Sequence, residues 1–115
     1  TDEVYSVEIV PELYRQAQER LQRLGYRNVH MRYADGYNGW EEHAPYDAII
    51  VTAAPQCIPQ PLVEQLADGG RMVIPVGPVG GYQVLWLLER AGDEVRRTEV
   101  MGVAFVPLTR RDDRL

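Results

Sequence analysis

Two acidic residues stand where a nucleotide-binding sheet places its ligand contacts, at or just after the end of a β-rich segment. Glu8 ends the segment that begins at Val4, and Asp35-Gly36 follows Val29–Tyr33. In a doubly wound sheet, an acid at the carboxyl end of a strand commonly accepts hydrogen bonds from ribose hydroxyls. A carboxylate at Asp35 would suit an adenine amino group, and the following glycine lets the backbone approach the ring. An exposed strand-end glutamate and an ordinary Asp-Gly turn explain the same residues, so both interpretations stay open.

Small residues follow a third segment, which is continuously apolar. Thr52-Ala53-Ala54-Pro55 comes directly after Ala48–Val51. Small side chains at the carboxyl end of a strand leave room for a ligand. They also permit a tight turn, so the sequence pattern alone leaves both interpretations open.

Residue sets for metal, nucleophilic or paired-carboxylate chemistry are missing from the sequence. It contains no Ser-His-Asp set and no pair of carboxylates in a persuasive context. Cys57 is the single cysteine, and His30 and His43 have no second thiol or His-x-x-x-His partner. We therefore predict no metal site.

The N-terminal elements are predicted from β propensity, helical spacing and turn residues. Val4–Val7 is short and β-rich, and Val29–Tyr33 is the second strand candidate. A helix is expected to begin at Pro11, because the first helical turn does not need the missing N–H of proline. Gly25 is its expected C-terminal stop. The apolar residues of this helix recur at helical spacing: Leu13, Tyr14, Ala17, Leu21 and Leu24.

The middle of the chain continues the alternation of strand and helix. The apolar run Ala48–Val51 is expected to form a strand that is covered on both faces. A short helix over Pro61–Ala67 should end at Gly69-Gly70. Met72–Ile74 should then form another buried strand, whose pairing Pro75 tends to end.

The C-terminal third is predicted to contain a hairpin. Tyr82–Glu89 and Val95–Phe105 flank Arg90–Asp93, which has the composition of a tight turn. Helices between parallel strands, followed by an antiparallel pair, indicate an α/β domain.

Composition and charge narrow the class of protein. The chain has 115 residues, room for one domain, and its net charge of −5 argues against a general affinity for nucleic acid or anionic membrane. Arg96-Arg97 and Arg110-Arg111 have acidic neighbours, which favours a solvated surface. No apolar run approaches the roughly 20 residues of a membrane helix. A single cysteine permits no internal disulfide, which suits the cytoplasm.

Five segments, spread over nearly the whole chain, match one known enzyme family. They are Tyr5–Glu8, Asp35-Gly36, Tyr46–Pro55, Gly69–Gly77 and Phe105–Leu108. In these segments the chain closely resembles the protein-L-isoaspartate O-methyltransferases. The resemblance implies an α/β, Rossmann-like S-adenosylmethionine-dependent methyltransferase sheet, mostly parallel with a C-terminal antiparallel hairpin. Residues 1–115 would form a partial methyltransferase domain, equivalent to the C-terminal two-thirds of the family's fold.

The resemblance also assigns roles to individual residues. It makes Glu8 the ribose-binding acid, packs Ile9 against the adenine face, and places Asp35 and Gly36 at the adenine. Thr52 would border the cofactor near its methyl group. The residues that match stretches near the peptide substrate are Ala53, Ala54, Pro75, Val76, Val106 and Leu108. The family's hydroxyl residue near the substrate would lie before Thr1, so we assign no catalytic residue.

The implied activity is methyl transfer from S-adenosyl-L-methionine to L-isoaspartyl residues of damaged proteins, a repair reaction. An isoaspartyl carboxyl group is already ionised near pH 7, given an ordinary pKa of about 3.9. The enzyme therefore has mainly to align the reacting atoms and exclude water. The alternatives are a nucleotide-binding oxidoreductase, since Glu8 would also suit a nicotinamide ribose, and a non-catalytic α/β fragment.

The chain begins where the resemblance reaches the family's second strand. The family's glycine-rich first strand and cofactor loop have no counterpart in the sequence. We therefore expect this piece alone to be inactive, and its unpaired strand edges to favour self-association.

Overall fold

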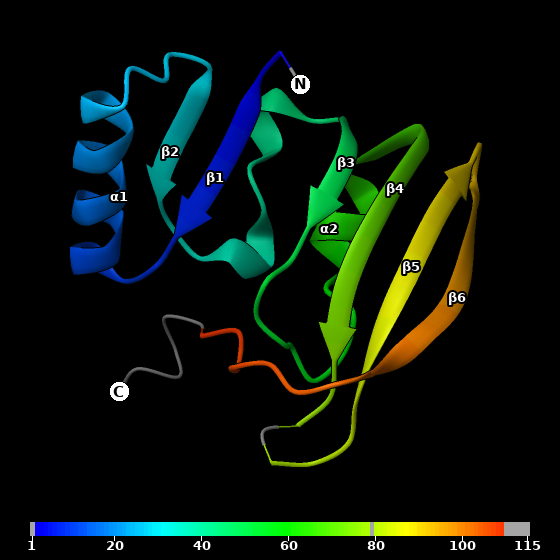
Figure 1. The fold of residues 1–115 in the computed structure, drawn as a ribbon. Helices are drawn as coiled ribbons and strands as arrows, with labels where there is room; N and C mark the ends of the chain where they lie inside the picture. Colours follow the sequence, from blue (N-terminus) through cyan, green and yellow to red (C-terminus); the bar gives the residue numbers. More distant parts are fainter. Residues whose placement is uncertain (1, 79, 110–115) are drawn as a thin grey trace. The chain divides into compact units, whose positions relative to one another are not determined.

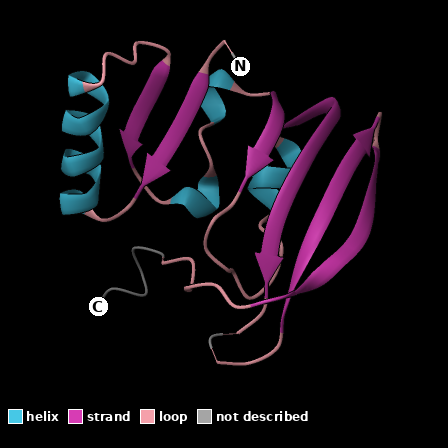
Figure 2. Ribbon diagram, viewed as in Figure 1, coloured by secondary structure: helices cyan, strands magenta, loops and turns pink. Residues whose placement is uncertain are grey.

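The computed structural model describes residues 2–78 and 80–109, which form two compact units. One unit comprises the described residues up to Trp40 together with Thr109, and the other comprises Glu41–Leu108. Each unit has its own sheet, as Figures 1 and 2 show. Arg110 and Arg111 lie outside the described residues.

The first unit is built on a strand–helix–strand arrangement. It contains β1 (Val4–Glu8), α1 (Pro11–Arg23), β2 (Val29–Tyr33) and the short 3₁₀ helix η1 (Gly36–Asn38). β1 and β2 pair in parallel, from Val4 opposite Val29 to Glu8 opposite Tyr33. Figure 1 shows α1 running alongside β2. Both strands and the helix were predicted from the sequence and are confirmed.

Local signals set both ends of α1. Pro11 occupies the first helical turn, as predicted. At the other end Gly25 has φ 80° and its N–H donates to the Gln22 carbonyl, while the Tyr26 N–H donates to the Leu21 carbonyl. This pair of hydrogen bonds around a left-handed glycine is a Schellman motif, which satisfies the last carbonyls of the helix.

Aromatic side chains gather on the β1–β2 pair. Tyr5 stacks on His30 with ring centroids 5.0 Å apart and meets the ring of Trp40 edge-on at 5.4 Å. The guanidinium of Arg32 lies 5.7 Å from the centre of the Trp40 ring. These contacts join the two strands to the chain that follows η1.

The second unit contains a mixed sheet and a short helix. Its elements are η2 (Glu41–His43), β3 (Tyr46–Ile50), α2 (Gln60–Glu64), β4 (Leu66–Val76), β5 (Gln83–Ala91) and β6 (Glu94–Val103). Among the described residues the strand order is β3-β4-β5-β6, with β3 parallel to β4 and the other two pairs antiparallel. The α/β class and the C-terminal hairpin are confirmed (Figure 2).

The core of this unit lies between α2 and one face of the sheet. Leu62 of α2 packs against buried residues of β4 and β5, which are Leu66, Met72, Ile74 and Leu88. Trp86 is partly buried against this cluster and pairs with Ile74 across β4 and β5. The alternation of side chains along each strand sends these apolar residues to the same face.

β3 is not covered on both faces in its own unit, contrary to the prediction. Ile49 and Val51 pack against the core, but Ile50 is 75% exposed and Ala48 is also exposed. Consecutive side chains of a strand point to opposite faces, and only one face of β3 meets α2 and the core of its unit.

The prediction that Gly69-Gly70 ends a helix is wrong. The helix already ends at Glu64, and both glycines lie inside β4, where Gly69 has φ 79°. They occupy an irregularity in the pairing with β3, where the register jumps from Tyr46–Leu66 to Ala48–Arg71. Extra residues on one strand of a pair form a bulge, and glycine is favoured there.

Pro75 ends one pairing of β4 and not the other. The Val51 N–H donates to the Val73 carbonyl, which is the last contact between β3 and β4. Two residues later, Pro75 faces the same side beyond the end of the β3 pairing, so its lack of an N–H removes no hydrogen bond to β3. On the other side β4 stays paired with β5 as far as Val76 opposite Val84.

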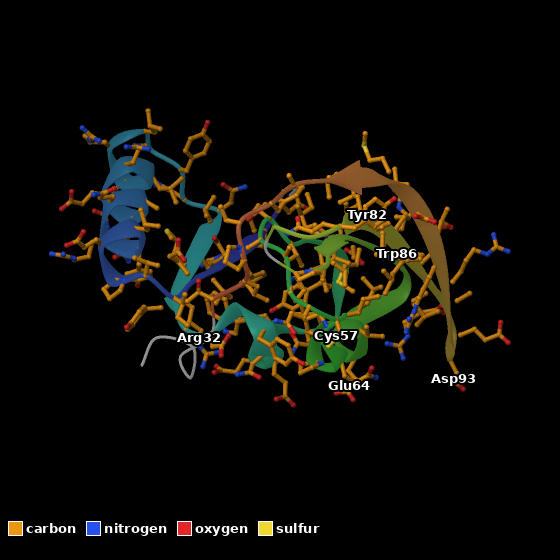
Figure 3. The ribbon with its side chains drawn as sticks, turned by 90° about the horizontal axis from the view of Figure 1, so that it is seen from below. Arg32, Cys57, Glu64, Tyr82, Trp86 and Asp93 are labelled. Atoms are coloured by element: carbon orange, nitrogen blue, oxygen red, sulfur yellow. The ribbon has the colours of Figure 1, made fainter. Side chains whose placement is uncertain are left out.

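The hairpin turn is tighter than predicted. β5 ends at Ala91 and β6 begins at Glu94, so Gly92-Asp93 forms a two-residue connection. Gly92 has φ 61°, as a type II′ turn requires at its first central position. Figure 3 labels Tyr82 and Asp93 near opposite ends of this hairpin. In the part of the chain that the structure describes, no helix is long and apolar enough to cross a membrane.

Candidate functional site

The parallel pairing of β1 and β2 brings the two predicted acids to one edge of the sheet. Glu8 lies opposite Tyr33, and the Ala34 N–H donates to the Glu8 carbonyl oxygen at 3.0 Å. Asp35 follows Ala34 directly, so both carboxylates lie at the carboxyl ends of neighbouring strands. This is the edge at which open α/β sheets bind their ligands.

The Glu8 carboxylate also orders the loop between β1 and α1. Its Oε2 accepts the Ile9 N–H at 2.8 Å and lies 3.5 Å from the Val10 nitrogen. Val10 precedes α1 and provides no side-chain cap for it. The half-buried carboxylate is therefore held at the strand end by its own backbone.

Asp35 performs a similar local task in the next loop. Its Oδ1 accepts the Tyr37 N–H at 3.0 Å and so caps the 3₁₀ helix η1. Asp35 and Gly36 are both half-buried. Ile9 is 6% exposed, so in this conformation a ligand ring would meet only a small part of its side chain. The proposed contacts of these residues with a cofactor stay predictions.

In the second unit the small residues after β3 pair with the C-terminal segment. The Ala54 N–H donates to the Val106 carbonyl at 2.7 Å, and the Leu108 N–H donates to the Ala54 carbonyl at 2.9 Å. Ala54 and Pro107 thus form a short parallel bridge. Three of the residues predicted to bind substrate are therefore neighbours: Ala54, Val106 and Leu108.

The predicted substrate residues differ in how accessible they are. Pro75 and Ala54 are buried, Ala53 and Val76 are half-buried, and Val106 is 68% exposed. Thr52, predicted to border the cofactor, is exposed. Val106 is the one exposed residue among the predicted substrate residues, while the buried ones shape the backbone around it.

The loop after β4 joins the same cluster. The Gly77 N–H donates to the Pro55 carbonyl at 2.9 Å. Gln83, at the start of β5, hydrogen-bonds through its side chain to Pro78 and Phe105. The sequence alone does not mark Gln83 as a functional residue. Its only signal is a polar residue just after Gly80-Gly81-Tyr82, and its burial depends on residues far away in the chain.

Each unit by itself offers groups that suit binding and alignment better than acid–base chemistry. The first unit provides carboxylates at strand ends, and the second provides small and apolar residues with a tightly bonded backbone. Among residues 2–78 and 80–109, no three side chains of histidine, cysteine, aspartate or glutamate are grouped so as to hold a metal ion.

Comparison with known proteins gives consistent results. The family model "Protein-L-isoaspartate(D-aspartate) O-methyltransferase (PCMT)" matches residues 1–113. The chain is 56% identical over 106 residues to a protein-L-isoaspartate O-methyltransferase of Picosynechococcus sp., covering 92% of this chain and 47% of that protein. It is 58% identical over 107 residues to protein-L-isoaspartate O-methyltransferase 2 of Polaromonas sp., covering 92% and 51%. The chain thus spans about half the length of the curated relatives it matches, and not the two-thirds expected from the sequence.

Two solved structures are similar in fold. One, described as a protein-L-isoaspartate O-methyltransferase, has a TM-score of 0.85 at 29% identity, over 91% of this chain and 33% of that one. The other is a candidate enzyme of the same description from Plasmodium falciparum, in complex with S-adenosyl-L-homocysteine. Its TM-score is 0.79 at 26% identity, over 95% of this chain and 53% of that one.

Proposed function

Because the chain belongs to the protein-L-isoaspartate O-methyltransferase family, we propose that its protein methylates the carboxylate of L-isoaspartyl residues in damaged proteins. The methyl donor is S-adenosyl-L-methionine. The observation that carries the proposal is the match of the family model to residues 1–113. The complex of the Plasmodium falciparum relative with S-adenosyl-L-homocysteine supports the choice of donor. Family membership leaves no reason to retain the oxidoreductase alternative.

Residues of the first unit are proposed to bind the nucleoside part of the donor. The Glu8 carboxylate would accept hydrogen bonds from the ribose hydroxyls, and Asp35 from the adenine amino group. Gly36 would let the backbone approach the ring, and Ile9 would contact its face. The shared strand edge and the ordered loops of Glu8 and Asp35 support this assignment.

Residues of the second unit are proposed to bind the peptide. Thr52 would border the donor, which supplies an electrophilic methyl group when bound. The substrate-binding residues are Ala53, Ala54, Pro75, Val76, Val106 and Leu108. The backbone bonds between Ala54 and the Val106–Leu108 segment support a common surface for the peptide.

The chemical step needs alignment more than proton transfer. An ionised isoaspartyl carboxylate can attack a sulfonium methyl group without a general base, because its ordinary pKa is about 3.9. Holding the reacting atoms in line and excluding water supplies the rate enhancement. We assign no catalytic residue within this chain.

We further propose that the two units belong to one partial methyltransferase domain over residues 1–115, and that the protein works in the cytoplasm. The family match across both units supports the first statement. The single cysteine of the chain supports the second, because it permits no internal disulfide.

Methyl incorporation into matched peptides tests the proposed activity. The full-length protein should transfer labelled methyl groups to an isoaspartyl peptide and not to the same peptide with normal aspartate. The extra backbone methylene of isoaspartate moves its carboxylate relative to the peptide chain, so a site shaped for one misaligns the other. Equal incorporation into both peptides would contradict the proposal.

A further inference from the structure

Gln83 is a buried glutamine whose amide bonds to two separate segments. Its side chain is at the start of β5, and the residue is 3% exposed. Oε1 accepts the Phe105 N–H at 2.6 Å, and Nε2 donates to the Phe105 carbonyl at 3.2 Å and to the Pro78 carbonyl at 3.2 Å. The amide thus satisfies both backbone groups of Phe105, as a neighbouring strand would.

The two segments that Gln83 joins are the ones that reach the residues after β3. Pro78 follows Gly77, whose N–H donates to the Pro55 carbonyl. Phe105 precedes Val106, whose carbonyl accepts the Ala54 N–H. The contacts form a closed ring that runs from Gln83 through each segment to Ala54-Pro55 and back.

The backbone around Gln83 leaves little freedom to rearrange. Gly77 has φ 146°, and a Cβ atom at this position would lie 2.4 Å from the Tyr82 carbonyl oxygen and 2.8 Å from the Gln83 Cα. The loop is therefore closed tightly against the start of β5. A side chain at position 83 without amide donors would lose the part-buried hydrogen bonds to the Pro78 and Phe105 carbonyls, and with them the contribution of these bonds to the closed loop.

We propose that Gln83 is a positioning residue for the peptide substrate. It holds the Phe105–Leu108 segment beside Ala54, so that the exposed Val106 and the adjoining backbone keep the shape that the peptide meets. Being buried, Gln83 does not contact the peptide itself. The inference rests on the proposed methyltransferase function and adds a residue that neither the sequence nor the family comparison assigned.

The test uses Gln83→Glu in the full-length protein. Glutamate has nearly the same shape and can accept the Phe105 N–H, but it cannot donate to the two carbonyls. We expect the KM for an isoaspartyl peptide to rise about tenfold with kcat nearly unchanged, because the lost binding is common to ground and transition states. Binding of S-adenosylmethionine, followed by calorimetry, should stay nearly unchanged.

Gln65→Glu is the matched control. Gln65 is also a buried glutamine of this unit, at 7% exposure, but its backbone carbonyl accepts the Tyr46 N–H at the start of β3. It therefore lies at the opposite end of that strand from Thr52. A rise in KM confined to Gln83→Glu supports the proposal. Equal rises in both variants, or none in either, overturn it.

Hydrogen exchange keeps the test independent of activity. In the parent protein the Phe105 amide should be protected, and in Gln83→Glu the amides of Ala54 and Leu108 should exchange faster while those of β4 do not. An unprotected Phe105 amide in the parent overturns the proposal.

If Gln83→Glu does not fold, Gln83→Met takes its place in the same measurements. Failure of both variants to fold assigns Gln83 to stability alone and also overturns the proposal. If the parent protein methylates neither the isoaspartyl peptide nor the aspartyl peptide, the proposed function is contradicted. The exchange rates of the Phe105, Ala54 and Leu108 amides still test the contacts of Gln83 in that case.

Discussion

Glu8 combines a local structural role with a proposed ligand contact, and mutation can separate them. Glu8→Ala should weaken binding of S-adenosylmethionine to the full-length protein by about 1.5–3 kcal/mol, the usual worth of charged hydrogen bonds. Glu8→Gln keeps an acceptor for the Ile9 N–H and should lose less. Calorimetric titration measures both, with Glu19→Ala on the exposed side of α1 as the control. Binding as tight as the parent in Glu8→Ala would show that the ribose assignment is wrong.

Asp35 permits a cleaner separation. Asp35→Asn retains an oxygen that can accept the Tyr37 N–H, so η1 should form as before. It removes the charge and replaces one carboxylate oxygen by an amide donor, which cannot accept from an adenine amino group. We expect affinity for S-adenosylmethionine to fall by about 1 kcal/mol, with little change in the thermal unfolding midpoint. A large fall in the midpoint with unchanged affinity would limit Asp35 to its turn.

The sequence predicts those site residues whose placement depends on neighbours along the chain. Glu8 and Asp35 were found because each stands at a recognisable strand end, and the parallel register confirmed that they share an edge. Two of the three side-chain hydrogen bonds of Gln83 depend on Phe105, which lies 22 residues away in the chain. No local pattern distinguishes such a glutamine from an exposed one.

Gly70 lies in the bulge of β4, where the surrounding backbone leaves little room for a side chain. A Cβ at Gly70 would lie 2.8 Å from the Ala67 carbonyl oxygen and 3.0 Å from the Tyr46 carbonyl oxygen. Both neighbours are backbone atoms that cannot move aside alone. Gly70→Ala should therefore destabilise the full-length protein by about 1–3 kcal/mol, as overpacking does. Urea denaturation monitored by circular dichroism measures the change.

Gly102→Ala is the control for this substitution. A Cβ at Gly102 would make only ordinary contacts, the closest at 3.6 Å from the Tyr82 ring. Its stability should stay within about 0.5 kcal/mol of the parent, as is usual for surface changes. Equal effects at the two glycines would show that the close approach at Gly70 does not limit the fold.

The ends of helices and strands agree with the predictions where one sequence feature determines them, and differ where the same residues suit two kinds of structure. α1 begins at Pro11 and ends at Arg23, and Gly25 closes it just after the C-cap as predicted, because these residues act on the helix ends directly. Gly69-Gly70 predicts a helix stop from the sequence, but a bulge favours the same residue type, and the bulge is what the structure has. The predicted burial of β3 on both faces is too high. An apolar run indicates that a strand can be covered, but it does not indicate which element of the unit covers each face.

The sheet edges determine the expected behaviour of the 115-residue chain by itself. Among the described residues, β1 pairs with β2 alone and β3 with β4 alone, so each has a second edge without a strand partner. Such edges pair readily with other chains. We expect this chain, expressed alone, to associate and to bind S-adenosylmethionine much more weakly than the full-length protein. Analytical ultracentrifugation and calorimetry check the two statements, and a stable monomer with micromolar affinity would contradict them.

The two tryptophans of the sequence give each unit its own optical reporter. Trp40 lies edge-on to Tyr5 in the first unit, and Trp86 packs against the core of the second. Trp40→Phe leaves emission from the second unit only, and Trp86→Phe leaves emission from the first. Denaturation curves of the two variants therefore follow the units one at a time. Coincident curves would mean that both melt as one cooperative body, and separated curves that each carries its own share of the stability.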